Sequence, residues 1–213
     1  MNSPLIYRMP ALNRRAERAP SNQNPVADTT GEFAPQGQAG PVWFLAGTFG
    51  DGPVTRHVQV PAGKALFFPI VNSAWVTTCI GEPRTIETIR PLVAAEIDAT
   101  TVFEATIDGV PVQDLGGYRA ESPLFCTSLT LFGVETVEDV EAAGFCAPGE
   151  ANPNCLDLPN PEEHFGPQDG FGPAMADGIW LMVAPLQKGE HTIGFSASRE
   201  GFAVDVTYHL QVQ

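Results

Sequence analysis

The sequence predicts a mostly β fold: an antiparallel two-sheet β-sandwich or jelly roll with one or two short helices. Gly and Pro are both abundant, at 21 and 20 of 213 residues, which favours many turns over long helices. Between those turns, short runs with the length and apolar pattern of strands recur at regular intervals. We expect a disordered or extended N-terminal arm over residues 1–38, which show no apolar period, and a single β-sandwich domain over residues 39–213.

The clearest strands are the segments in which apolar and polar residues alternate. Residues 54–60 and 203–212 both alternate, which is typical of strands with one buried and one exposed face. The dipeptide Asp108–Gly109 separates two further runs and predicts a β-hairpin. The remaining strands are expected at 42–47, 65–71, 102–107, 123–132, 179–186 and 191–198.

Apolar spacing also predicts one helix and favours a second. Between residues 85 and 100, apolar residues fall on a single stripe at helical spacing. The members of this stripe are Ile86, Ile89, Val93 and Ile97. A single-turn helix is expected at 137–144, where Thr136 would cap its start and Gly144 would end it.

Some of the expected strands are apolar on both faces, namely 42–47, 65–71 and 179–184. A simple sandwich buries one face of each sheet, so something must cover the other face of these strands. The candidates are the helix at 88–99, the long loop at 144–175 and another subunit. Pro69 inside the second of these strands predicts an edge position or a bulge.

The charge of the chain limits its partners. The net charge is -14, and four of the eleven basic residues lie in the first twenty positions, so the body is more acidic than the average. Such a surface repels nucleic-acid phosphates and anionic lipid, and we expect neither as a partner. No segment has the ~18 to 20 apolar residues that cross a bilayer, so no membrane span is expected.

Four cysteines, an even number, permit two disulfides. Cys146 and Cys155 flank a segment without helix or strand signal, which a covalent link would order, and Cys79 would then pair with Cys126. Free thiols are the alternative, while zinc is disfavoured because no CxxC spacing is present. Disulfides would place the protein in an oxidising compartment, secreted or periplasmic. The N-terminus lacks the apolar region of a secretory signal, so we expect a mature or trimmed form.

Several long strings resemble a family of uncharacterised predicted secreted bacterial proteins. The strings are NPVADTTG…GQAGPVWFLAGTFG, VPAGKALFFPIVNS, TIDGVPVQDLGGYRAESPLF and ADGIWLMVAPLQKGEHTIGF…FAVDVTYHLQV, in the same order along most of residues 24–213. The resemblance implies export and an all-β fold, and it brings no activity and no catalytic residue with it. The chain departs from the family at its start, where an arginine-rich segment replaces a signal peptide and a Trp-rich lead-in.

The first candidate site is the polar face shared by two alternating strands. If strands 54–60 and 203–212 are neighbours, His57, His209 and Asp205 could lie on one face, beside Gln59 and Thr207. Histidine and aspartate can act as a base and its orienting partner, or as metal ligands. An ordinary solvent-facing strand surface is the alternative interpretation.

The loop sequence PNPEEHFGPQDGFG is the second candidate site. It gathers oxygen and nitrogen ligands in one segment, namely Glu162, Glu163, His164 and Asp169. The sequence predicts no cofactor, although such ligands would suit calcium. No EF-hand or zincin spacing is present, so a plain polar loop is the alternative.

Aromatic residues and nucleophile motifs complete the search for a site. Trp43 and Trp180 lie in strands that are apolar on both faces and are expected in the core. Trp75 follows the end of a strand and could stack on a ligand such as a sugar ring. The chain has no GxSxG motif, no SxxK motif and no phosphate-binding loop.

These observations favour a binding domain over an enzyme. The preferred hypothesis is an extracytoplasmic binding or interaction domain, with a glycan or a cell-surface protein as partner. One alternative is a hydrolase or lyase that uses His57, Asp205 and His209. The other is a structural subunit that forms a homo-oligomer through the strands that are apolar on both faces.

Overall fold

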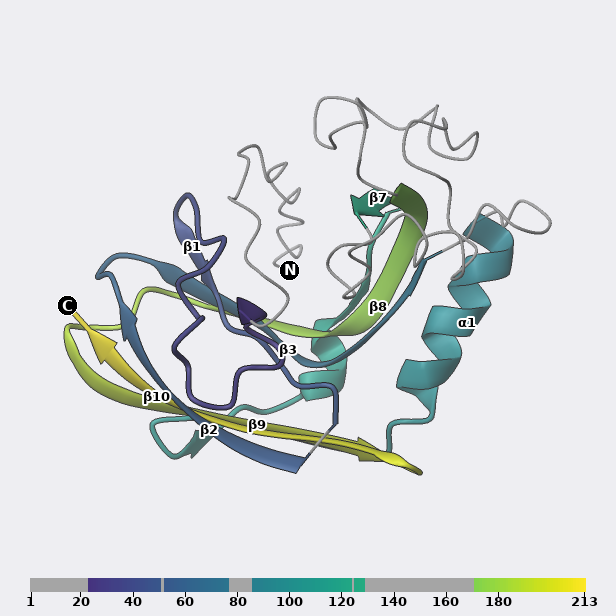
Figure 1. The fold of residues 1–213 in the computed structure, drawn as a ribbon. Coiled ribbons are helices and arrows are strands. Elements are labelled where there is room, and N and C mark those ends of the chain that lie inside the picture. Colours follow the sequence, from purple (N-terminus) through teal and green to yellow (C-terminus); the bar gives the residue numbers. More distant parts are fainter. Residues whose placement is uncertain (1–22, 51, 77–85, 124, 129–170) are drawn as a thin grey trace, which may run out of the picture.

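The computed structural model shows two mixed β-sheets packed face to face, with one α-helix at one end (Figure 1). The mostly β, two-sheet fold predicted from the sequence is therefore confirmed. The structure describes residues 23–50, 52–76, 86–123, 125–128 and 171–213.

The first sheet, called here the β3–β8 sheet, has the order β1-β3-β8-β6, and β7 also pairs with β8. Its strands are β1 (Val42–Phe44), β3 (Ala65–Val76), β6 (Arg119–Glu121), β7 (Phe125–Ser128) and β8 (Phe171–Val183). The pairing of β3 with β8 shifts register between Pro69 and Val71, which confirms the predicted bulge. The start of β8 at Phe171 also shows that the expected loop at 144–175 ends earlier than predicted.

The second sheet, called here the β9–β10 sheet, has the order β2-β10-β9-β4-β5. Its strands are β2 (Gly52–Val60), β4 (Val102–Ile107), β5 (Val110–Pro111), β9 (Gly189–Arg199) and β10 (Phe202–Val212). Asp108 and Gly109 have φ angles of 51° and 76° and join β4 to β5, which confirms the predicted hairpin. A short 3-10 helix, η2 (Leu115–Tyr118), follows this hairpin.

The predicted purely antiparallel pairing is wrong in both sheets. β1 pairs with β3 in parallel, and β2 pairs with β10 in parallel along its whole length. The reason is that β2 continues through a turn into β3 of the other sheet instead of folding back as a hairpin. Its neighbour therefore comes from the far end of the chain and runs in the same direction.

The core lies between the sheets and is built from the inward positions of the alternating strands. Every second residue of β10 is buried there, as predicted: Val204, Val206, Tyr208, Leu210 and Val212. Phe68 of the β3–β8 sheet stacks on Phe195 of the other sheet with ring centroids 5.2 Å apart, and Phe195 in turn contacts Tyr208. Trp43 is also buried in this core, as expected.

Helix α1 (Ile86–Asp98) packs at one end of the two sheets (Figure 1). Ile89 and Val93 are fully buried against Met175, and Ile97 joins the main core. Arg119 of β6 binds both the buried carboxylate of Asp177 in β8 and the carboxylate at the last residue of the helix, and these bonds raise the pKa of Arg119. Within the described part of the chain, no helix is long and apolar enough to cross a membrane.

The helix does not cover the outer face of the β3–β8 sheet, contrary to one of the expectations above. Met175 is paired with Trp75, and alternation places both on the same side of the sheet as the core residues Val71 and Ile179. The opposite side carries Phe44, Phe67, Trp180 and Met182. Trp180 is half-buried and stacks on Phe67, and Met182 is 44% exposed.

Residues 23–38 fold onto the domain, in contrast to the predicted arm. The backbone N–H of His57 in β2 donates to the carbonyl of Thr30, and Ala34 is buried in the main core. A Cβ at Gly31 would lie 2.8 Å from the His57 carbonyl oxygen, so glycine permits the close approach of this loop to β2. Residues 1–22, the rest of the predicted arm, lie outside the described part of the chain.

Candidate functional site on the outer face of β2 and β10

Strands β2 and β10 present two different cross-strand pairs on their two faces. In the parallel register, Arg56 lies opposite Tyr208 and His57 lies opposite His209. Successive residues of a strand point to opposite faces, so the first pair points into the core and the second points to solvent. Arg56 is 1% exposed, and both histidines are exposed.

The inner pair is built around a buried guanidinium. Arg56 makes five hydrogen bonds, all to neutral acceptors, and no carboxylate of the described residues forms an ion pair with it. The acceptors are the carbonyl oxygens of Val26, Asp28, Ala46 and Gly47 and the hydroxyl of Tyr208. Because a buried charge is costly unless its donors are satisfied, this full set of bonds is what allows an arginine at a core position.

Tyr208 completes the inner network. Its hydroxyl donates to the Ala46 carbonyl at 2.8 Å and accepts from Arg56 Nη1 at 2.7 Å. Burial raises the pKa of Tyr208, since the phenolate would lose its hydration. The two side chains thereby tie β2 and β10 to the loops at residues 26–28 and 46–47.

The Asp28 carboxylate shapes the first of these loops. It accepts hydrogen bonds from the backbone and hydroxyl of Thr30, both at 2.7 Å, and from the backbone of Phe33 at 2.8 Å. Burial alone would raise the pKa of Asp28, but the hydrogen bonds from Phe33 and Thr30 outweigh it and hold this pKa below its usual value. The loop is thus held in the shape that presents its carbonyls to Arg56.

The outer pair belongs to a repeated sequence. Residues 54–60 read VTRHVQV and residues 206–212 read VTYHLQV, identical except at the third and fifth positions. The parallel register places each repeated residue beside its copy: Thr55 by Thr207, His57 by His209, and Gln59 by Gln211. Thr207 is half-buried and the other members of this set are exposed. We call these six side chains the Thr-His-Gln face.

The two histidines of this face stack on each other. Their ring centroids are 4.9 Å apart and the rings are inclined by 21°. Within the described residues, neither ring makes a hydrogen bond or an ion pair. The chain has four histidines in all. Two of them lie side by side here, with their ring nitrogens available to a ligand.

His191 differs from this pair because both of its ring nitrogens have a bonding partner within the protein. Its Nδ1 lies 2.8 Å from Asp108 Oδ2, and its Nε2 lies 2.9 Å from the Gln187 carbonyl oxygen. Both partners can only accept, so both ring nitrogens must carry a proton for the two bonds to form. The bond to Asp108 raises the pKa of His191, and the same bond lowers the pKa of Asp108.

Asp205 is not brought together with the histidine pair. It lies four residues before His209 on the same strand, which corresponds to about 13 Å at the usual rise of a strand. Its partner across β2 is Pro53. A carboxylate at that separation cannot orient either imidazole by a direct hydrogen bond. The two strands are neighbours, which was the condition set for this site, but the three residues do not form one compact site.

Trp75 lies in the interior and not on an open surface. It is half-buried and packs against the cluster of Ile89, Val93 and Met175, between β3 and α1. Its ring therefore contributes to the attachment of the helix, and its stacking on a sugar stays a prediction.

The other candidate residues lie mostly outside the described part of the chain. This applies to the loop ligands Glu162, Glu163, His164 and Asp169, and to Cys79, Cys146 and Cys155. Cys126 lies in β7, where only its backbone is described. The disulfides, the predicted loop site and the helix at 137–144 therefore stay predictions.

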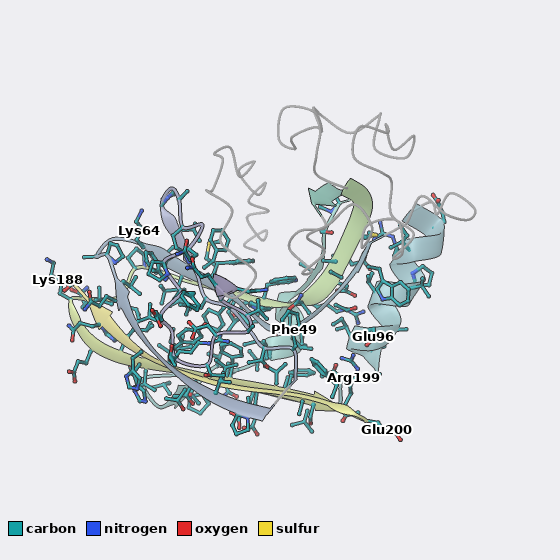
Figure 2. All side chains as sticks on the ribbon, in the orientation of Figure 1. Phe49, Lys64, Glu96, Lys188, Arg199 and Glu200 are labelled. Atoms are coloured by element: carbon teal, nitrogen blue, oxygen red, sulfur yellow. The ribbon has the colours of Figure 1, made fainter. Side chains whose placement is uncertain are left out.

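A groove of about 550 Å³ opens at the α1 end of the molecule. Figure 2 shows three of its lining residues, Glu96, Arg199 and Glu200, close together. Lys64 and Lys188 lie at the opposite end of the molecule (Figure 2). Two of its three charged side chains are paired with each other. Arg199 forms an ion pair with Glu96, and its guanidinium lies 4.3 Å from the centre of the Phe202 ring. Glu200 is the remaining charged side chain of the lining, and one exposed carboxylate does not define a ligand site.

Two features of the site escaped the sequence interpretation. Alternation already placed Arg56 on the same side as Val54 and Val58, so its burial could have been anticipated. The repeat of 54–60 at 206–212 was also readable from the sequence. What no pattern gave was the register that sets the two copies side by side.

Comparison with known proteins found no match among protein-family models, curated proteins or solved structures. The functional interpretation therefore rests on the geometry of the chain itself.

Proposed function

We propose that this protein is a non-catalytic, extracytoplasmic binding domain that engages its ligand through the Thr-His-Gln face. The observation that carries the proposal is the repeat, which sets identical polar side chains side by side on an exposed sheet surface. Folding does not require this identity, because an outward strand position accepts many polar residues. The even number of cysteines and the resemblance to secreted bacterial proteins support the location.

A neutral glycan is the ligand class that fits this surface best. Hydroxyl, imidazole and amide groups supply both donors and acceptors, as the hydroxyl groups of a sugar require. Their spacing is about 4.8 Å across the strands and about 6.7 Å along them, so a chain of sugar units could meet successive rows. The net charge of -14 disfavours an anionic polymer.

The geometry does not favour the enzymatic alternative in the form expected from the sequence. A base needs an orienting or proton-accepting partner within hydrogen-bond reach. Among the described residues, His57 and His209 have no such partner except each other, and Asp205 lies about 13 Å along the strand. Binding without turnover is the simpler use of this surface.

Affinity electrophoresis against a panel of neutral polysaccharides tests the proposal. The wild-type chain is expected to be retarded by at least one of them. The double variant Gln59→Ala/Gln211→Ala is expected to lose at least about tenfold in affinity, since it removes two amides from the surface. Asn72→Ala, on the exposed part of β3 in the other sheet, is the matched control and should bind as the wild type does. Equal binding by the double variant and the control would contradict the proposal.

Self-assembly is a second candidate function, favoured by the outer face of the β3–β8 sheet. Phe44, Phe67, Trp180 and Met182 line that face, and an apolar surface of this kind is typical of an interface between subunits. Light scattering at increasing concentration tests it, with Met182→Lys expected to shift an oligomer toward monomer. A wild-type monomer at every concentration would remove this candidate.

A further inference from the structure

We propose that His57 and His209 together form a bidentate binding site for a divalent transition-metal ion, with copper(II) bound most tightly. The proposal uses the same face as the glycan proposal but does not rest on it, because metal binding needs the two imidazoles alone. Neutral imidazole nitrogen is among the commonest metal ligands in proteins and suits copper, nickel and zinc. Among these ions, copper(II) forms the strongest complexes with a given set of nitrogen ligands.

The spacing of the two rings fits a shared ion. The ring centroids are 4.9 Å apart and the ring planes are inclined by 21°. The two residues occupy directly opposed positions of neighbouring strands. Two nitrogens in neighbouring positions of a square-planar copper(II) site, each about 2.0 Å from the ion, lie about 2.8 Å apart. Because both side chains are exposed, each ring can rotate about its side-chain bonds until one nitrogen of each ring points at a shared ion.

The contacts of the two rings leave them available, and this distinguishes them from His191. Asp108 and the Gln187 carbonyl occupy both nitrogens of His191. No described residue bonds to the nitrogens of His57 or His209. The backbone beneath the pair is nevertheless fixed, since the His57 N–H donates to Thr30 and Arg56 anchors the adjacent position. A rigid backbone under two free imidazoles reduces the entropy lost when the ion binds.

The remaining coordination positions of the ion would be open to water. Within the described residues, no cluster of three or more His, Cys, Asp or Glu side chains is placed to hold a metal, so no third ligand of that kind completes the site. Thr192 of β9 lies opposite His209, and its hydroxyl is a weak ligand. A site with two protein ligands and open positions is expected to bind reversibly.

Copper titration of the full chain tests this inference, using protein without a histidine tag that has been treated with a chelator. Isothermal titration calorimetry is expected to give one bound Cu²⁺ per chain, and electron paramagnetic resonance to show coupling to imidazole nitrogen. His57→Gln and His209→Gln should each weaken binding by about a hundredfold, because one ligand of a chelating pair is lost. Circular dichroism confirms that each variant is folded.

Two further variants act as controls. His191→Gln removes a histidine whose nitrogens are already bonded, and it should leave the affinity for Cu²⁺ unchanged. His164→Gln tests the metal site predicted in the loop and should also have no effect. The inference is overturned if the wild type binds Cu²⁺ no more tightly than about 1 mM, if both His57 and His209 variants bind as the wild type does, or if His164→Gln alone abolishes binding. Polysaccharide binding is tested through different residues, so either proposal can fail without the other.

Discussion

The two faces of the β2–β10 pair differ in how their polar groups are satisfied. On the inner face, Arg56 and Tyr208 direct every donor to an acceptor within the protein. On the outer face, one residue further along each strand, His57 and His209 stack on each other, and neither ring forms a hydrogen bond or an ion pair with another described residue. A buried polar group left unpaired costs stability, whereas an exposed one exchanges its bonds with water and can bind a ligand. The inner pair should therefore govern stability and the outer pair should govern binding.

The largest effect is expected for Arg56→Met. The variant keeps much of the side-chain volume but leaves the carbonyl oxygens of Val26, Asp28 and Gly47 without their donor. The Ala46 carbonyl keeps the bond from the Tyr208 hydroxyl, which itself loses the guanidinium as a donor. We expect the free energy of unfolding to fall by about 3 kcal/mol or more. Urea denaturation measures it, and Lys188→Ala on an exposed turn is the control, with a change of less than about 0.5 kcal/mol. A loss of less than about 1 kcal/mol in the free energy of unfolding of Arg56→Met would mean that water can donate to the carbonyl oxygens in place of the guanidinium.

A smaller effect is expected for Tyr208→Phe. The ring stays in the core against Phe195, and only the hydroxyl between Ala46 and Arg56 is lost. We expect the free energy of unfolding to fall by about 1–2 kcal/mol. Combined with Arg56→Met, the loss should be less than the sum of the single losses, because the two side chains share one network. Additive losses would show that the two side chains act separately.

The sequence predicted strands β2 and β10, but it did not predict that they pair with each other. The valines at 54, 58 and 60 and the alternation at 203–212 identify two half-buried strands because a period of two is a local property. Which strands pair, and in which direction, depends on how the chain crosses between sheets, and no local pattern encodes that. For the same reason, Asp205 could be placed on the correct face but not at its distance from the histidines.

Trp75 illustrates a second limit of the sequence. The residue follows a predicted strand end at Val71, and a tryptophan there is a reasonable ligand platform. The structure extends β3 to Val76 and packs α1 over this part of the strand, which turns Trp75 inward. The apolar stripe of the helix was visible in the sequence, but the surface that it would cover was not.

The ion pair between His191 and Asp108 makes the stability of the protein depend on pH. The pKa of His191 is raised above its usual 6.5, so its contribution to stability is complete below pH 6.5 and is lost as the pH rises through the folded-state pKa. The pKa of Asp108 is lowered below 3.8, so its contribution is complete above pH 3.8 and is lost as the pH falls through the folded-state pKa. The pair should therefore stabilise the protein most between these two values.

Asp108→Asn tests this window while keeping a residue that tolerates the left-handed turn. Because the carboxylate is largely exposed, the effect should be no more than about 0.5 kcal/mol. The difference in thermal midpoint between wild type and variant, measured from pH 5 to pH 9, should shrink above pH 6.5. A difference that stays constant over this range would show that the imidazolium does not contribute.

The smallest effect on stability is expected for the double variant His57→Gln/His209→Gln. Both side chains are exposed, and neither bonds to another residue that the structure describes, so the free energy of unfolding should change by less than about 0.5 kcal/mol in the absence of metal. Urea denaturation in the presence of a chelator measures it, beside Arg56→Met. A loss comparable to that of Arg56→Met would mean that the outer pair is structural, and the contrast between the two faces would fail.

We assign ligand binding to the outer face of β2 and β10 and stabilisation of the fold to the inner face. This assignment is tested most directly by locating a bound paramagnetic ion from its effect on the amide signals of individual residues. Amide signals of the isotope-labelled full chain are recorded while Cu²⁺ is added below one equivalent. We predict that signals disappear first around residues 55–59 and 207–211 and at Thr192, which lies beside His209 in β9. Losses that begin around residue 164, or that spread evenly over the chain, would contradict the assignment of binding to this face.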